Sequence, residues 1–104
     1  MSILSEHPAV QLAEKQLKLH ISRHLPKAQV WLFGSRARQK GLRRSDFDLA
    51  VDLGSETPES ALNDFEESIR ADTEIIYQVD VVNLRSVSTT LRANIQREGI
   101  LWKN

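Results

Sequence analysis

Apolar residues near the start of the chain recur at the spacing of one helical face. The pattern follows Pro8, whose fixed φ and missing N–H suit the first turn of a helix. Its members lie three or four residues apart and are Val10, Ala13, Leu17 and Ile21. Because a proline disfavours helical geometry in the residue before it, this helix is expected to end before Pro26. The next apolar run, residues 29–33, predicts a short buried strand.

From Asp46 onward apolar and polar residues alternate, which is typical of a strand with two different faces. One face would contain Phe47, Leu49, Val51 and Leu53. The other would contain Asp46, Asp48, Ala50 and Asp52. A sheet covered by helices on both faces would have almost continuously apolar strands. The alternation therefore predicts a two-layer domain, with helices on the apolar face and an open face that contains the acidic residues.

The second half of the chain predicts two more helices and one more strand. The pair Thr57–Pro58 has the N-cap and first-turn signature of one helix, and Gly99 is a typical C-terminal cap for the other. Between these helices, residues 76–84 alternate as a strand. The apolar tail, residues 100–102, is expected to pack back on the domain. This order of elements indicates the α/β class in a single domain of 104 residues. Connections of helical length favour parallel strands, whereas the short link over residues 34–45 allows either direction.

Composition narrows the functions that the chain can have. Fourteen Lys and Arg residues balance fourteen Asp and Glu, so the sequence lacks the basic surplus of proteins that coat nucleic acid or anionic lipid. We therefore expect neither direct nucleic-acid binding nor membrane attachment. The absence of cysteine excludes disulfides, thiolate nucleophiles and Cys-ligated metal centres. Because no apolar run approaches the length of a membrane span and no signal peptide is evident, we expect a cytoplasmic protein.

The acidic face of the alternating strand suggests a metal site. Asp46 and Asp48 are two residues apart, so their side chains point the same way, and Asp80 lies in the next predicted strand. Three such carboxylates could converge on Mg²⁺, which prefers oxygen ligands and completes its shell with water and substrate phosphates. The alternative is that these aspartates form the solvated side of an ordinary amphipathic strand.

A glycine–serine pair at the end of the first strand suggests a phosphate site. Gly34 permits unusual backbone angles and close approach of another group. Backbone N–H groups and the Ser35 hydroxyl at such a turn can cradle a phosphate. The alternative is an ordinary turn at a strand end. A phosphate cradle beside a metal-binding carboxylate cluster is what nucleotide chemistry requires.

These residues together resemble a known family. Gly34-Ser35, ten further residues and then Asp46-Phe47-Asp48 form the pattern of the nucleotidyltransferase superfamily that includes DNA polymerase beta. Asp80 matches the third carboxylate of that superfamily. The stretch FGSRARQKGLRRSDFDLAV is similar to the minimal nucleotidyltransferases (MNT proteins), which consist of the catalytic domain alone. The resemblance implies the two-layer nucleotidyltransferase fold for residues 1–104, a small mixed sheet with helices on one face and an open catalytic face.

The resemblance also implies a mechanism. The catalytic and metal-binding residues would be Asp46, Asp48 and Asp80, which would hold two Mg²⁺ ions with ATP as the substrate. Asp80 could also assist deprotonation of the attacking hydroxyl. The nucleotide-binding residues would be Gly34, Ser35, Arg36 and Arg38. Attack on the α-phosphorus would release pyrophosphate and leave a nucleotidyl group on the acceptor.

The acceptor is expected to belong to a separate chain, since no residues follow Asn104 to grip it. The resemblance implies the kind of chain, because MNT proteins are often the antitoxin partners of HEPN-domain ribonuclease toxins. In such pairs an MntA-type antitoxin transfers AMP from ATP to a toxin tyrosine and silences the toxin. Two alternatives remain open. One is a non-catalytic antitoxin or nucleotide sensor that acts by occlusion, and the other is an enzyme that modifies a small molecule such as an aminoglycoside.

Several other residues have ordinary structural explanations. His20 and His24 have a spacing that can bind zinc, but no Glu beside the first His and no third ligand nearby support a zinc site. Trp31 and Phe33 are expected in the core. A solvated helix face would contain Asp64, Glu66, Glu67 and Asp72. A solvated loop, or one that contacts a partner, would contain Lys40, Arg43 and Arg44.

Overall fold

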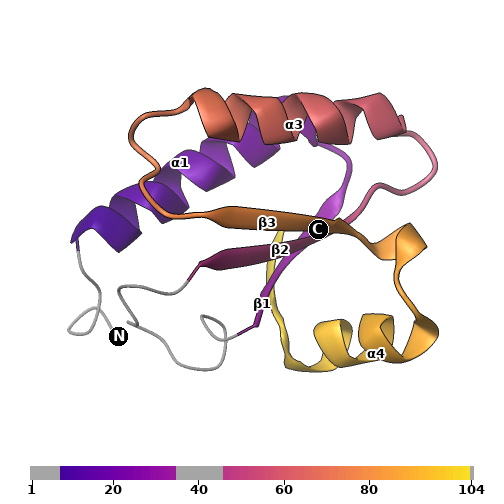
Figure 1. The fold of residues 1–104 in the computed structure, drawn as a ribbon. Coiled ribbons are helices and arrows are strands. Elements are labelled where there is room, and N and C mark those ends of the chain that lie inside the picture. Colours follow the sequence, from indigo (N-terminus) through magenta and orange to yellow (C-terminus); the bar gives the residue numbers. More distant parts are fainter. Residues whose placement is uncertain (1–7, 35–45, 104) are drawn as a thin grey trace.

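A computed structural model describes residues 8–34 and 46–103 of the chain (Figure 1). Its helices are α1 (Pro8–His24), α3 (Glu59–Ala71) and α4 (Thr89–Glu98). Its strands are β1 (Gln29–Phe33), β2 (Phe47–Asp52), β3 (Val79–Asn83) and β4 (Ile100–Lys103), and a short 3₁₀ turn, η2 (Leu84–Ser86), follows β3. As predicted, α1 starts at Pro8 and ends before Pro26. None of the helices in the described ranges has the length and apolar composition that crossing a bilayer requires.

The strands form one mixed sheet in the order β3-β2-β1-β4. β1 is antiparallel to both β2 and β4, and β2 is parallel to β3. The predicted α/β fold with a small mixed sheet is therefore confirmed. The apolar tail does pack back on the domain, but it does so as the edge strand β4, because the backbone groups on that side of β1 need hydrogen-bond partners.

Helices α1 and α3 cover one face of the sheet, above it in Figure 1. This face contains the apolar side of β2, on which Phe47, Leu49 and Val51 are at most 1% exposed. They pack with Phe65 of α3 and with the apolar stripe predicted for α1. Trp102 of β4 adds its ring to the same core at 6.2 Å from Phe47. The predicted core face is confirmed.

Helix α4 lies on the opposite side of the sheet and covers part of the second face (Figure 1). Trp31, Ala50 and Ile95 form a second buried cluster there, closed by Leu84. Of the residues that the structure describes, 8–34 and 46–103, none of the helices covers the end of the second face that contains the acidic residues. Ala50 explains why α4 covers part of this face. Its small apolar side chain lies between Asp48 and Asp52 on β2 and is fully buried in this cluster.

Two helix ends differ in detail from their predictions. The N-cap of α3 is Pro58, with no side-chain cap hydrogen bond, and Thr57 is buried. Gly99 does cap α4, but its φ of −77° is not left-handed. Glycine is needed at this position because a Cβ would lie 2.6 Å from the Ile95 carbonyl oxygen and 3.0 Å from that of Leu32. The cap therefore serves the close approach of α4 to β1.

Candidate active site

Three side chains from neighbouring strands lie side by side at the end of the second face opposite the part that α4 covers in the described residues. Phe33 at the end of β1 is in register with Asp48 of β2, and Asp48 is in register with Asp80 of β3. Residues in register on neighbouring strands point to the same face, and the strands are ~4.8 Å apart. The structure therefore brings Asp48 and Asp80 together, as the sequence predicted. Asp46 precedes β2 by one residue and is exposed.

The carboxylates of Asp46, Asp48 and Asp80, which we call the aspartate row, repel one another. The pKa of Asp48 is raised above its ordinary value, first by burial of the half-buried side chain and then by the negative charges of Asp80 and Asp46. Asp80 is exposed, and its Oδ1 accepts a hydrogen bond of 3.3 Å from Nε2 of Gln78. The three predicted aspartates thus share one electrostatic environment, in which a bound cation would be favourable.

Gly34 brings the chain that leaves β1 against Asp48. Its φ is +78°, a left-handed conformation that residues with a Cβ rarely adopt. A Cβ at this position would collide with Oδ2 of Asp48. Close approach to a carboxylate is therefore the reason for glycine here. The other predicted nucleotide-binding residues, Ser35, Arg36 and Arg38, lie outside the described residues, as do Lys40, Arg43 and Arg44.

The donor set suits a hard cation that brings ligands of its own. In residues 8–34 and 46–103, no three His, Cys, Asp or Glu side chains are grouped closely enough to hold a metal ion by themselves. Mg²⁺ usually binds through one or two carboxylates and completes its octahedron with water and substrate phosphates. Asp48 and Asp80, with Asp46 nearby, suit this kind of Mg²⁺ coordination, because the phosphates of a nucleotide would supply the remaining ligands.

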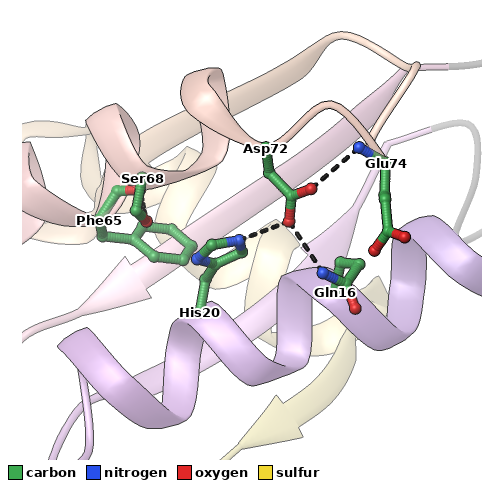
Figure 2. Close-up of polar contacts among 6 residues, drawn as sticks. All are labelled: Gln16, His20, Phe65, Ser68, Asp72 and Glu74. Atoms are coloured by element: carbon green, nitrogen blue, oxygen red, sulfur yellow. Dashed lines mark hydrogen bonds and ion pairs between the residues drawn. The ribbon is translucent and has the colours of Figure 1, made fainter.

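A second polar cluster joins α1 to the end of α3, the two helices on the first face of the sheet (Figure 2). Oδ2 of Asp72 is 2.8 Å from Nε2 of His20 and accepts a 3.0 Å hydrogen bond from Nε2 of Gln16. Oδ1 of Asp72 accepts from the backbone N–H of Glu74 at 2.9 Å. The predicted solvated position of Asp72 is therefore wrong, since its side chain is only 11% exposed. His20 serves this contact, which the local pattern could not reveal because the partners are 52 residues apart.

The Asp72 cluster predicts a pH-dependent stability. Its hydrogen bonds, with that from His20 first, lower the pKa of Asp72 below its ordinary value. The stabilisation is thus complete above the unfolded-state pKa of ~3.9 and is lost as the pH falls through the lower folded-state pKa. Asp72→Asn should reduce the free energy of unfolding at pH 7 by about 1–3 kcal/mol in urea titrations. The free energy of unfolding of this variant should also decrease less steeply as the pH falls below about 4. Asp64→Asn, an exposed change on α3, should leave both quantities unchanged.

The family model described as "Polymerase beta, Nucleotidyltransferase" matches residues 15–103. The chain therefore belongs to this nucleotidyltransferase family, which confirms the resemblance found in the sequence. No curated protein matches the sequence.

Solved structures similar to this chain include toxin–antitoxin complexes. A toxin–antitoxin structure with AMP-PNP has 27% identity and a TM-score of 0.66, covering 88% of this chain and 73% of that chain. The tri-AMPylated Shewanella oneidensis HEPN toxin in complex with MNT antitoxin has 26% identity and a TM-score of 0.63, covering 90% and 73%. A minimal nucleotidyltransferase, at 24% identity and a TM-score of 0.66 over 88% and 90% of the two chains, shows the same fold.

Proposed function

We propose that this chain is a magnesium-dependent nucleotidyltransferase that moves AMP from ATP to a tyrosine of a HEPN-domain ribonuclease and thereby neutralises it. The observation that supports the proposal most directly is the register of Asp48 with Asp80 beside Gly34, which gathers acidic groups where a cation and phosphates could meet. The similar complex of a tri-AMPylated HEPN toxin with MNT antitoxin supports the choice of acceptor. This chain and its HEPN partner would form a toxin–antitoxin pair.

Each residue of the site has a role in the proposal. Asp46, Asp48 and Asp80 would hold the magnesium ions, whose charge would stabilise the entering and leaving oxygens of the transferred phosphoryl group. Gly34 would let backbone N–H groups approach the triphosphate, with Ser35 beside it. Repulsion among the carboxylates favours their cation-bound state, so the protein would stand ready for the metal before the nucleotide arrives.

The transfer itself would be an in-line displacement. The tyrosine oxygen would form a bond to the α-phosphorus, the bond from that phosphorus to pyrophosphate would break, and the tyrosine proton would pass to Asp80. The Asp80 carboxylate has about four lone-pair sites, so the hydrogen bond from the Gln78 amide to Oδ1 leaves sites both for a magnesium ion and for this proton. The exposure of Asp80 would give a protein acceptor access to it.

A reconstitution experiment tests the proposal. The full chain is mixed with ATP, Mg²⁺ and the product of the neighbouring gene, which the proposal expects to be a HEPN-domain ribonuclease, and both proteins are analysed by intact mass spectrometry. We expect the HEPN protein to gain whole AMP units on tyrosine and its ribonuclease activity to fall. Replacement of the modified tyrosine by phenylalanine is the control and should prevent the gain.

Two outcomes would contradict the proposal in different ways. If neither protein gains mass, the enzymatic function is wrong. If the Asp46→Asn, Asp48→Asn double variant neutralises the ribonuclease as well as the unaltered chain does, neutralisation by occlusion replaces neutralisation by transfer.

A further inference from the structure

A pocket of about 300 Å³ lies between the end of β1 and α4, on the same face as the aspartate row. Phe33 and Gly34 form the wall on the side of β1. Leu91, Asn94, Ile95 and Glu98 form the wall on the side of α4. This volume is at the lower end of the range for small-molecule sites. The pocket would therefore hold one ring system rather than a whole cofactor.

The position of the pocket connects it to the proposed chemistry. Phe33, in its wall, is in register with Asp48, so the pocket begins one strand away from the carboxylates. Gly34 belongs both to this wall and to the close contact with Asp48. A nucleotide with its phosphates at Gly34 and the aspartates could therefore place its base in the pocket without leaving this face of the sheet.

The walls suit a flat ring with polar edges. Phe33, Leu91 and Ile95 offer apolar surface, and Leu91 is 41% exposed although it is a large hydrophobic residue on a surface helix. Stacking of a base on such side chains is favourable for every base and gives affinity without selecting one. Among the wall residues that the structure describes, Asn94 and Glu98 have polar side chains, and selection between bases would come from them.

Arg97 contacts both polar side chains of the wall and determines which group of Asn94 is left to donate. Its Nη2 donates a 2.6 Å hydrogen bond to Oδ1 of Asn94 and lies 3.6 Å from Oε2 of Glu98. Because Arg97 uses the Asn94 oxygen, Asn94 has its NH₂ group left to donate. The carboxylate of Glu98 can only accept. The wall thus combines one donor with one acceptor, tied to each other by one guanidinium.

We propose that this pocket binds the base of the nucleotide and selects adenine over guanine, an inference that rests on the proposed function. The exocyclic amine of adenine would donate to Glu98, and the neighbouring ring nitrogen would accept from Asn94. Guanine reverses both groups, since it has a carbonyl oxygen in place of the amine and an N–H in place of the acceptor nitrogen. Guanine would therefore set an acceptor against Glu98 and a donor against Asn94.

Calorimetric titration of the full chain with ATP or GTP, each with Mg²⁺, tests this proposal. We expect ATP to bind at least about tenfold more tightly than GTP. Glu98→Gln should reduce that ratio about fivefold or more, because the new amide can turn its NH₂ toward the guanine oxygen. Leu91→Ala should weaken both nucleotides by about the same factor, since it removes stacking surface without polar atoms.

The control is Glu67→Gln, the same chemical change at an exposed position of α3 on the other side of the sheet, and it should leave the ratio unchanged. Equal affinities of the unaltered chain for ATP and GTP, or a ratio that Glu98→Gln does not change, would overturn the base pocket while leaving the proposed transfer reaction intact. If the unaltered chain binds neither nucleotide, the proposed function and the proposed base pocket are both wrong.

Discussion

Replacing both Asp46 and Asp48 by asparagine should abolish nucleotidyl transfer and, at the same time, stabilise the metal-free protein. Transfer should fall by about a thousandfold or more, because a catalytic metal supplies several kcal/mol of transition-state stabilisation and asparagine cannot replace the carboxylate charge. The measurement is the initial rate of AMP incorporation into the HEPN protein at saturating ATP and Mg²⁺.

The gain in stability follows from the sign of the pKa shift at Asp48. The pKa is raised in the folded state, so the folded protein binds this proton more tightly than the unfolded chain does. Stability is therefore lost as the pH rises through the raised folded-state pKa, and at pH 7 the ionised carboxylate is a net cost. Neutral side chains remove that cost, and we expect the free energy of unfolding to rise by about 0.5–1 kcal/mol in urea titrations with EDTA.

Asp52→Asn is the matched control for both measurements. Asp52 also lies on β2, but its Oδ1 accepts a 3.1 Å hydrogen bond from the backbone N–H of Gly54, a bond that asparagine can retain. This variant should keep full transfer and show no gain in stability. Full activity of the Asp46→Asn, Asp48→Asn variant would exclude the metal-binding role, and a loss of its stability would exclude the repulsion.

Gly34→Ala is expected to damage both folding and activity. The left-handed backbone alone costs a residue with a Cβ about 1–2 kcal/mol, and the Cβ would also press on the carboxylate of Asp48. We expect the free energy of unfolding to fall by about 1–3 kcal/mol. Transfer should fall about a hundredfold, because a displacement of the order of 1 Å at a reacting group has that effect.

Gly54→Ala separates the cost of a left-handed backbone from the effect of contact with Asp48. Gly54 has nearly the same φ, +73°, but the nearest atom to a Cβ there is the Lys27 carbonyl oxygen at 3.9 Å, which is ordinary contact. This variant should lose about 1–2 kcal/mol of stability and keep its transfer rate. If both alanine variants retain full transfer, contact between Gly34 and Asp48 has no part in catalysis, whatever their stabilities.

Local patterns of residues were sufficient to predict the parts of the molecule that depend on neighbours along the chain. The two prolines set the bounds of α1, and the alternation from Asp46 to Leu53 assigned each side chain of β2 to its face. Both patterns act over a few residues, where backbone sterics and side-chain direction decide the outcome. The glycine–serine and aspartate motif also lies within a short stretch of sequence. The family and the candidate site could therefore be predicted from the sequence, and the family model confirms the family.

Contacts between residues far apart in the chain depend on how the whole domain packs. The register of β2 with β3 sets Asp48 against Asp80, and it depends on the packing of the whole crossover between them. The pairing of β4 with β1, the cover of Ala50 by α4 and the contact of Asp72 with His20 are of the same kind. Each of these contacts forms because it buries apolar surface or satisfies hydrogen bonds between segments far apart in the chain. Local periodicity of the sequence does not report such contacts.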